Sequence, residues 1–410
     1  ITAMISAGQA YRMNFLRRLN IYKLSLQKVV DNNNLLNINK KIYILNDKKV
    51  IVVGAGPSLD KNIDWFCQHK DSFIIVSVGA SLPTLLKYNI TPDIVVEVHP
   101  ELDMLATYKK FNKDNLKDII FLGANQIPKE LLEQFNIDNS FIFLTNMIIK
   151  EHLGVKTGTS VGNVAIYLSL MFQPKELYFL GIDFALSSEG TTHTDSHAYR
   201  KKLDDTTQMD IKQKNYIHEG NLFAVKGNLK ESVLTNSLFY KFLEGANNEL
   251  SLYKNNNIFN LSDGAYIENT TPLKADDVEI SSIYDKVNFK QEFKNELENI
   301  SEHGLNTEDL ESINNMIKLL NDYTTTEYND KDIRKYFNDI LINKNLDGAY
   351  KELILNFVQM IFHYVDGFLN DESFNFKQRT KHIKNMDKLL YQHFIKLTID
   401  YKKILEDKIK

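Results

Sequence analysis

The sequence has little of what marks secreted, membrane-spanning or nucleic-acid-binding proteins. Cys67 is its only cysteine, so an internal disulfide is excluded and a reducing compartment is expected. No apolar run reaches about 18 residues, which excludes a transmembrane helix, and the first residues lack the apolar core and cleavage site of a signal peptide. The net charge of −4 gives no reason to expect nucleic acid or a membrane surface as a partner. We therefore expect a cytoplasmic protein.

Two well-known catalytic motifs are also absent. There is no GxxxxGK[ST] loop, so a P-loop ATPase is not expected, and there is no GxSxG elbow to indicate a hydrolase triad. What remains is an ordinary globular composition, with 43% apolar and 25% charged residues, in a chain long enough for two or three domains. The chain begins with Ile1 rather than Met, as a piece of a longer protein would.

Three zones differ in their sequence pattern. Residues 1–48 contain a predicted helix from Met4 to Asp31, whose apolar residues recur every three or four positions, and we interpret this zone as an N-terminal helical connector. Residues 49–270 alternate short apolar runs with amphipathic stretches. Residues 271–410 are poor in proline and glycine, and their long amphipathic runs predict a C-terminal helical domain. The clearest predicted helices of this last zone are Ile333–Leu341, Ala349–Phe362 and Met386–Ile404.

The middle zone has the pattern of a Rossmann-like, doubly wound α/β domain. Short runs rich in Val, Ile and Phe predict buried parallel strands, and the segments between them predict helices such as Ser81–Tyr88 and Val161–Phe172. The predicted strands are Val50–Val53, Phe73–Val76, Ile94–Val98, Ile119–Leu122, Phe141–Leu144 and Leu177–Leu180. Such sheets bind ligands at the carboxyl ends of their strands, and the polar motifs of this chain follow those ends.

The stretch VGAGPSLDK, Val53–Lys61, links the first predicted strand to a helix. Gly54 and Gly56 allow backbone conformations, and a close approach of a ligand, that other residues block. Pro57 suits the first turn of a helix, Ser58 can cap it, and amides at a helix start can bind an anion. The third glycine of a dinucleotide fingerprint is missing. A phosphate-bearing ligand and a tight turn without a ligand both remain open.

A second turn, KTGTSVGNVA, begins at Lys156 and precedes an apolar helix. Thr157, Thr159 and Ser160 place hydroxyl groups around its glycine, and Asn163 adds an amide in the first helical turn. Two such turns in one α/β domain suit a ligand that has a phosphate and a polar base or sugar. The alternative is an ordinary helix cap.

A polar loop follows the last strong strand of the middle zone. Asp183 lies just after that strand, and the loop then carries His193, Asp195 and His197. A histidine can act as a general base near neutral pH, and a neighbouring carboxylate can orient it. The same HxDxH spacing also fits metal ligands, but two His and one Asp are too few to favour a metal.

These pieces together resemble the motility accessory factor (Maf) flagellin glycosyltransferases, whose central domain belongs to a group that also contains an archaeal pterin diphosphokinase. The matching pieces are GAGPSLDK at Gly54, TPDIVVEV at Thr91, GTSVGNVA at Gly158, LGIDFA at Leu180, GTTH at Gly190 and LSDGAYIENTTPL at Leu261. They cover roughly residues 50–275, about half of the chain. The GPSL turn, the TS turn and the GIDF strand end are also similar to bacterial sialyltransferases that use CMP-sialic acid.

The resemblance implies transfer of pseudaminic or legionaminic acid, two nonulosonic acids, from a CMP-sugar to Ser or Thr of flagellin, as flagellar assembly and motility require. It implies His193 as the first choice for the base that deprotonates the acceptor hydroxyl. The implied catalytic residues are His193, Asp183 and His197, and the implied donor-binding residues are Gly54, Gly56, Pro57, Ser58, Gly79, Thr159, Ser160 and Asn163. Because the donor carries its own carboxylate, no metal is required, although Mg²⁺ is compatible with this chemistry.

The chain departs from these families at three positions. Ile182 stands where sugar-transferring relatives often have Gln, Ala185 where the sialyltransferases have Tyr, and His99 where Maf proteins tend to have an acid. These departures leave the donor sugar open.

Two other functions also remain open. One is an ATP- and Mg²⁺-dependent enzyme like 6-hydroxymethylpterin diphosphokinase, for which Asp93, Glu97 and Asp183 are the available acids. The other is a non-catalytic flagellin-binding protein. Nucleotide preference would separate the first from a glycosyltransferase, and sugar transfer would separate the second.

Overall fold

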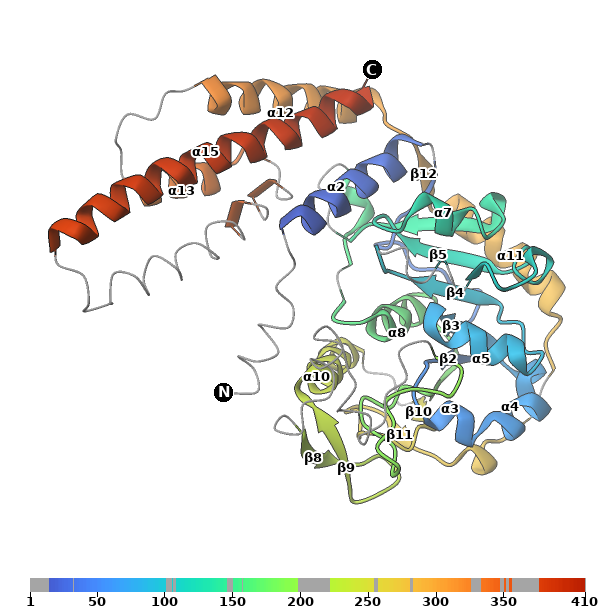
Figure 1. Cartoon of the computed structure of the whole chain (residues 1–410). Coiled ribbons are helices and arrows are strands. Elements are labelled where there is room, and N and C mark those ends of the chain that lie inside the picture. Colours follow the sequence, from blue (N-terminus) through green and yellow to red (C-terminus); the bar gives the residue numbers. More distant parts are fainter. Residues whose placement is uncertain are drawn as a thin grey trace. The chain divides into compact units, whose positions relative to one another are not determined.

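The computed structural model of the chain describes residues 15–31, 33–100, 105, 108–145, 150–156, 158–197, 222–253, 257–280, 283–325, 333–346, 350–351, 354–355 and 376–409. Within these ranges the chain forms two compact units (Figure 1). The first unit comprises residues 34–145 and 153–302, and the second comprises residues 15–33, 150–152 and 303–409. The boundaries predicted after residues 48 and 270 both lie inside the first unit.

The first unit is built on a ten-stranded sheet in the order β11-β10-β7-β2-β3-β4-β5-β6-β1-β12. Neighbouring strands from β11 to β1 are parallel. The six strands predicted from the sequence are its centre, within two residues at each end: β2 Lys49–Val53, β3 Ile74–Val78, β4 Ile94–Glu97, β5 Ile120–Ala124, β6 Ser140–Phe143 and β7 Glu176–Leu180. Their apolar runs are continuous because helices cover both faces of a parallel sheet.

The remaining strands are short or lie apart from this centre. β1 (Asn34–Leu36) and β12 (Ser301–His303) extend one edge of the large sheet. β10 (Ile258–Asn260) and β11 (Thr271–Pro272) extend the other. A separate antiparallel hairpin is made by β8 Leu222–Lys226 and β9 Ser232–Asn236. None of these six was predicted. Four have only two or three residues, and such short strands are specified by their neighbours rather than by a local pattern. β8 and β9 are longer, but most of their residues are half-buried or exposed, so they lack the apolar run of a buried strand.

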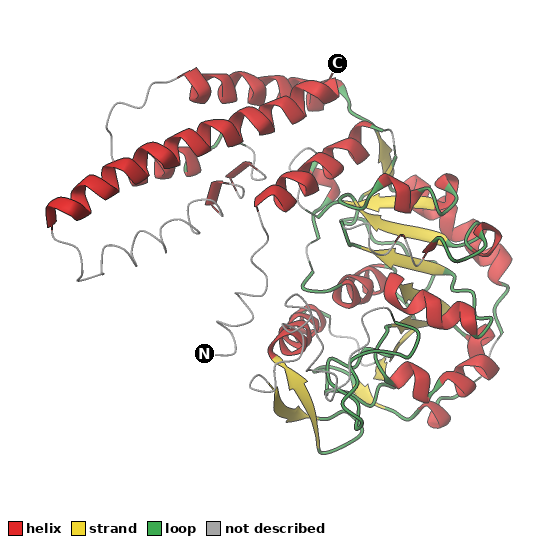
Figure 2. Cartoon of the chain, viewed as in Figure 1, coloured by secondary structure: helices red, strands yellow, loops and turns green. Residues whose placement is uncertain are grey.

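Helices flank the sheet of the first unit (Figure 2). They are α3 Ser58–Lys61, α4 Ile63–His69, α5 Leu82–Lys87, α7 Lys129–Leu132, α8 Val161–Met171, α10 Ser237–Ser251 and α11 Lys286–Asn299, with 3-10 turns at Lys70–Ser72, Gly79–Ser81, Lys113–Asn115, Ile137–Asn139, Glu151–Leu153 and Ala275–Asp277. The predicted helices Ser81–Tyr88 and Val161–Phe172 are confirmed as α5 and α8.

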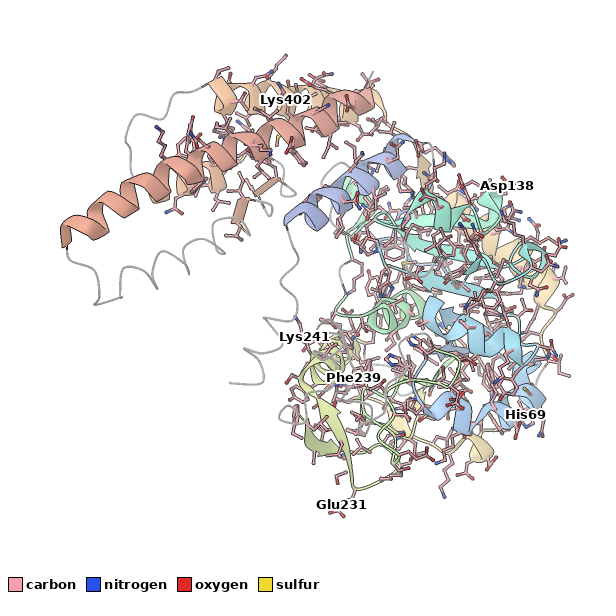
Figure 3. All side chains as sticks on the ribbon, viewed as in Figure 1. His69, Asp138, Glu231, Phe239, Lys241 and Lys402 are labelled. Carbon is pink, nitrogen blue, oxygen red and sulfur yellow. The ribbon has the colours of Figure 1, made fainter. Side chains whose placement is uncertain are left out.

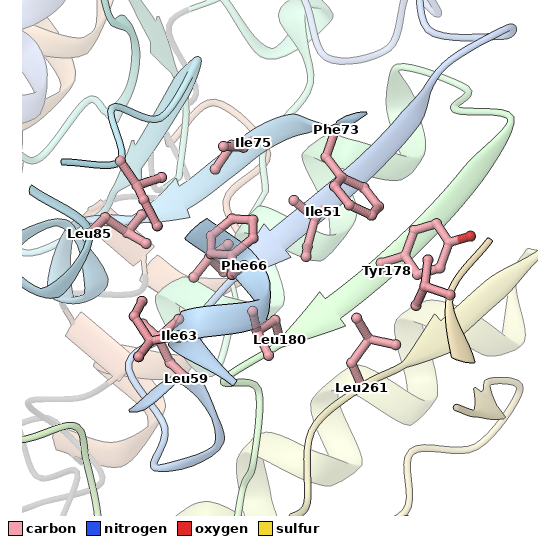
Figure 4. Packing of buried hydrophobic residues seen from close by; sticks show 13 residues of the cluster. Ile51, Leu59, Ile63, Phe66, Phe73, Ile75, Leu85, Tyr178, Leu180 and Leu261 are labelled. Carbon is pink, nitrogen blue, oxygen red and sulfur yellow. The ribbon is translucent and has the colours of Figure 1, made fainter. Parts of the chain in front are cut away.

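A buried apolar cluster holds α3, α4 and α5 against the sheet (Figure 4). Ile51 and Val53 of β2 belong to this cluster together with Leu59 and Phe66 of these helices, and Figure 4 shows Ile51 beside Phe66. Alternate residues of a strand point to opposite faces, so Val50 and Val52, also fully buried, are left for the other face. This packing fixes the chain on both sides of the Gly54–Ser58 turn.

The described part of the second unit is helical. It contains α2 Phe15–Val30, α12 Thr307–Thr325, α13 Ile333–Leu341 and α15 Phe376–Ile409. Tyr22 of α2 meets Tyr401 of α15 edge to face at 6.3 Å between ring centres. Lys402 of α15 donates a 2.9 Å hydrogen bond to Asn321 of α12 (Figure 3 labels Lys402). No helix in the described ranges is both long and apolar enough to cross a bilayer.

The helical character predicted for the two ends of the chain is confirmed where the structure describes them. The predicted helix Met4–Asp31 is present from Phe15 to Val30, and its first residues lie outside the described ranges. Most of the predicted helix Ala349–Phe362 also lies outside them. The fold class, a Rossmann-like α/β domain with helical segments before and after it, is confirmed.

Candidate functional site

The strand order places a switch point between β2 and β7. From β2 the chain adds β3 to β6 on one side, and it then returns to add β7 on the other side. Ligands of open α/β sheets bind beyond the carboxyl ends of the strands at such a point. The Gly54–Ser58 turn follows β2 and Asp183 follows β7, so the two strongest motifs of the sequence meet there.

The glycines of the first turn are required by contact with the protein itself. The Gly54 amide donates to Leu180 O at 2.9 Å, and the Gly56 amide donates to Gly181 O at 2.8 Å. A Cβ atom at Gly54 would collide with Gly181 O, and one at Gly56 would collide with Gly181 O and with the Asp183 carboxylate. The sequence predicted close approach of a ligand, and the structure shows close approach of the β7 end.

The start of α3 already holds an anion, the carboxylate of Asp183. The Ser58 hydroxyl donates to one oxygen of this carboxylate, and the Ser58 amide donates to the other at 3.3 Å. The Ser58 hydroxyl oxygen accepts from the Asp263 amide at 2.6 Å, and the Ala265 amide donates to Asp183 O at 2.8 Å. Hydrogen bonds around Asp183 thus join three segments that are distant in sequence: the Ser58 turn, the end of β7, and residues 263–265.

Asp183 is 6% exposed, and its environment shifts its pKa upward to about 6. Burial is the main cause because it disfavours the charged form, and the neighbouring Asp263 adds to it, whereas the two Ser58 bonds and Lys230 act in the opposite direction. At neutral pH the carboxylate is therefore mainly ionised and accepts both Ser58 bonds. Its contacts make it a positioning group for the turn in this conformation.

The second turn joins α8 to α10. The Ser160 hydroxyl caps α8 by accepting from the Asn163 amide at 3.2 Å, and the Asn163 side chain donates to Phe242 O of α10 at 2.9 Å. A Cβ at Gly245 of α10 would collide with Thr159 Oγ1. The predicted cap is thus present. Thr157 lies outside the described residues.

The histidine loop is fixed on top of the first turn. The Thr194 amide donates to Ala55 O at 2.9 Å, and its hydroxyl lies 3.0 Å from the hydroxyl of Thr84. The Asp195 amide donates to the Asp60 carboxylate at 2.8 Å. The loop that carries the predicted base therefore reaches the β2–β7 switch point, as its placement after β7 suggested.

His193 and His197 stack on each other in this loop, with ring centres 4.2 Å apart and planes 10° apart. Phe239 of α10 meets His193 edge to face at 6.0 Å (Figure 3 labels Phe239). Burial lowers the pKa of His193 to about 3, with a further contribution from His197. Burial, followed by His99, lowers the pKa of His197 to about 4. Both rings are neutral at neutral pH, and such low values make them weak bases in this conformation.

A second buried carboxylate, Glu97, lies at the carboxyl end of β4. Its Oε1 accepts from the Val98 amide at 2.8 Å, the His99 amide at 3.0 Å and the His99 ring Nδ1 at 2.7 Å. Tyr108 donates its hydroxyl to Oε2 at 3.4 Å. A Cβ at Gly79 would collide with this Oε2, so Gly79, a predicted ligand-binding residue, makes room for Glu97.

The pKa of Glu97 is lowered even though burial, its largest single influence, acts to raise it. The charge and ring hydrogen bond of His99, together with the two backbone amides, outweigh the burial. Glu97 is thus ionised at neutral pH inside the protein. From the sequence, Glu97 was a candidate residue only for the kinase alternative, and His99 was only a departure from the family pattern. The available signal was an acid inside the apolar run IVVEV.

The acids of the kinase alternative are not gathered in one place. Asp93 precedes β4, whereas Glu97 ends it. Asp93 accepts from the Ile75 amide at 2.9 Å and pairs with Lys286 and Lys290 of α11 at 3.1 and 3.6 Å. Among the described residues no group of three or more His, Cys, Asp or Glu side chains is arranged to hold a metal ion.

Comparison with known proteins places this site in context. Residues 22–189 match a family described as 6-hydroxymethylpterin diphosphokinase MptE-like. The chain is 26% identical over 185 residues to the 6-hydroxymethyl-7,8-dihydropterin pyrophosphokinase of Methanocaldococcus jannaschii, which covers 39% of this chain and 69% of that protein. It is also 30% identical over 63 residues to an uncharacterized protein of Treponema pallidum, which covers 15% of this chain and 30% of that one.

Among solved structures, the chain is similar to a Maf glycosyltransferase from Magnetospirillum magneticum AMB-1, with a TM-score of 0.57 and 16% identity. The similarity covers 97% of this chain, and this chain spans 59% of the length of that protein. At this identity the likeness shows the fold. The resemblance found in the sequence, to Maf proteins with a pterin-kinase-like central domain, is thereby confirmed.

Proposed function

We propose that this protein is a cytoplasmic glycosyltransferase that transfers pseudaminic or legionaminic acid from a CMP-sugar to Ser or Thr of flagellin, for flagellar assembly and motility. The single observation that carries the proposal is the switch point between β2 and β7 in a Maf-like fold. There the Gly54–Ser58 turn contacts the histidine loop, and Gly162 in the first turn of α8 faces Ile182 after β7. A switch point of this kind is where open α/β sheets bind nucleotides, which suits a nucleotide-activated donor.

The donor would be bound by the two turns and the start of α8. Loss of CMP leaves positive charge on the anomeric carbon and negative charge on the phosphate. The first amides of α8, which no helical carbonyl can satisfy, and the hydroxyls of Thr159 and Ser160 are suited to stabilise that phosphate. Because the Ser58 amide already binds Asp183, we assign the Gly54–Ser58 turn to shaping the site rather than to holding phosphate.

The acceptor needs a base, since a serine or threonine hydroxyl must lose its proton during transfer. His193 and His197 were the predicted bases, and both lie in the loop above the switch point. Their low pKa values weigh against this role in the present conformation. The proposed step does not require Mg²⁺. Comparing transfer with and without Mg²⁺ tests this expectation.

The test is transfer itself. The protein would be incubated with flagellin and one donor at a time, with and without Mg²⁺. The donors are CMP-pseudaminic acid, CMP-legionaminic acid, CMP-N-acetylneuraminic acid and UDP-N-acetylglucosamine. The mass of intact flagellin would then be measured by mass spectrometry. We expect a mass gain of one nonulosonic acid residue with a CMP donor only. No gain with any CMP donor, under conditions in which the chain is folded, would contradict the proposal.

A second candidate function is an ATP-dependent pterin pyrophosphokinase, which the family match over residues 22–189 favours. Thermal unfolding separates the two before any transfer assay. A ligand at about 100 times its dissociation constant stabilises a protein by roughly 2.7 kcal/mol. Stabilisation by CMP or CDP alone supports the glycosyltransferase, and stabilisation by ATP with Mg²⁺ supports the kinase. No response to either would favour a flagellin-binding protein without catalysis.

A further inference from the structure

The Glu97–His99 pair has the construction of an acid–base device. Glu97 is almost completely buried, with a side chain 1% exposed, whereas the side chain of its partner His99 is 46% exposed. Two backbone amides and the imidazole Nδ1 all bind the same carboxylate oxygen. A buried carboxylate held in this way is fixed in place, and it fixes the ring that it binds.

The ionisation of Glu97 decides which nitrogen of His99 carries the proton. An ionised carboxylate only accepts hydrogen bonds, so the 2.7 Å contact requires a proton on Nδ1. In the neutral ring Nε2 then has the lone pair, which is the arrangement of a general base. The carboxylate also stabilises the imidazolium that forms when Nε2 takes a proton.

The position of the pair is suited to the chemistry proposed above. His99 follows β4, which lies beside β3 at the carboxyl edge of the sheet. The turn Gly79–Ser81 at the end of β3 connects the pair to the switch point, because a Cβ atom at Gly79 would collide with Glu97 Oε2 and the Ser81 hydroxyl donates to Val53 O at 2.8 Å. The next helix, α5, contacts the loop that carries His197 through the hydroxyls of Thr84 and Thr194, 3.0 Å apart. His197 in turn stacks on His193. Within the described residues, Glu97 from β4 binds the His99 ring, and Tyr108 donates to the other oxygen of the Glu97 carboxylate at 3.4 Å.

We propose that His99, oriented by Glu97, is the general base of the transfer reaction and that His193 and His197 instead form the wall of the acceptor site. This proposal rests on the proposed glycosyltransferase function. In the step, His99 Nε2 takes the proton of the acceptor hydroxyl, and the hydroxyl oxygen forms a bond to the anomeric carbon. The bond between that carbon and the phosphate oxygen breaks, its electron pair leaves with CMP, and the imidazolium later gives its proton to water.

The experiment measures kcat and KM for transfer from CMP-pseudaminic acid to flagellin. For His99→Gln we expect kcat to fall about 10²- to 10⁴-fold, as loss of a general base does, with the KM for the donor within about twofold. For His99→Gly, added imidazole should restore part of the rate. Glu97→Gln should lower kcat about tenfold or more. The matched control is His303→Gln, an exposed position of β12, which should leave both parameters unchanged.

Full transfer activity in His99→Gln, with active wild-type protein, would overturn the proposal and leave the proposed function intact. If the wild-type protein transfers no sugar from any CMP donor, the proposed function fails. The pair is then tested without the reaction, by ¹⁵N NMR of histidine-labelled protein. A proton on Nδ1 of His99 in the wild type, and loss of that preference in Glu97→Gln, would support the acid–base device. A proton on Nε2 in the wild type would overturn it.

Discussion

Two buried carboxylates at strand ends of the same sheet have opposite uses. Asp183 after β7 and Glu97 at the end of β4 are both almost inaccessible to water, and each has a glycine opposite it that leaves room for the carboxylate, Gly56 and Gly79. Asp183 binds a serine hydroxyl and an amide within the protein, and its pKa is raised. Glu97 binds a partly exposed imidazole, and its pKa is lowered.

The difference shows that burial alone does not decide what a carboxylate does. Neutral donors only partly offset the desolvation of Asp183, so its charge destabilises the folded state and its value lies in joining three segments. The His99 ring and two backbone amides together overcome the desolvation of Glu97, so its carboxylate is available to act on that ring. Four experiments test this difference, and they follow in order of expected effect.

The largest effect is expected from filling the glycine spaces. Gly56→Ala places a methyl group against the carbonyl oxygen of Gly181 as well as the Asp183 carboxylate, and neither can move away without disturbing the β7 end. We expect a loss of about 3 kcal/mol or more in the free energy of unfolding, measured by urea denaturation. Gly79→Ala meets mainly the end of the longer Glu97 side chain and the Tyr108 hydroxyl, so its loss should be smaller. Equal losses would contradict the difference in packing.

The next effect concerns the pH dependence that Asp183 contributes. Its folded-state pKa of about 6 lies above the ordinary aspartate pKa of 3.8, so its contribution to stability is complete below pH 3.8 and is lost as the pH rises through 6. Each pH unit in that window removes about 1.4 kcal/mol, for a total of at most about 3 kcal/mol. In Asp183→Asn this loss should be absent. The measurement is the free energy of urea unfolding of the wild type and of the variant, each followed across this pH range. Parallel profiles would show that the carboxylate is not desolvated.

His193 should contribute pH dependence of the opposite sign. Its pKa of about 3 lies below the unfolded value of 6.5, so its contribution is present above pH 6.5 and is lost as the pH falls through that window. Between pH 6.5 and 5 the wild type should lose about 2 kcal/mol through this group. His193→Gln should remove that slope in the same unfolding experiment, whereas the exposed control His303→Gln should retain it.

The smallest effects come from the hydroxyl groups beside the two carboxylates. Ser58→Ala removes a hydrogen bond to a buried charge and should lower the free energy of unfolding by about 1.5 kcal/mol. Tyr108→Phe removes a long bond, 3.4 Å, to a carboxylate that keeps three other donors, so its loss should be below about 1 kcal/mol. A larger loss for Tyr108→Phe than for Ser58→Ala, in chemical denaturation, would reverse the ranking of the two supports.

Much of the fold could be predicted because its central strands carry their own signal. The runs VIVV at Val50 and LYFL at Leu177 indicate strands because a strand buried on both faces is apolar at every position. The hairpin β8–β9 has only alternating half-burial, and β11 has two exposed residues, so neither stands out in the sequence. Their positions follow from tertiary contacts such as those of Asn228 with Asn260 and Ser262.

The site could be predicted as a set of strand ends but not as a set of contacts. The turn at Gly54–Ser58 and the strand end at Asp183 were both identified, but the carboxylate and the serine are 125 residues apart. Nothing local shows that one occupies the anion site of the other. In the same way, His193 was the first choice for the base because its loop follows a strand end, with a carboxylate, Asp195, close by in the chain. The carboxylate that does bind an imidazole is Glu97, in another segment.

The position of β2 also has a consequence for the synthesis of the chain. Its pairing with β7 joins Val50 to Leu177, so one edge of β2 has no partner until residues 176–180 have left the ribosome. Such long-range parallel pairing is slow to form, and an unpaired apolar strand edge promotes aggregation. A nascent chain that ends before β7 would thus be a substrate for molecular chaperones.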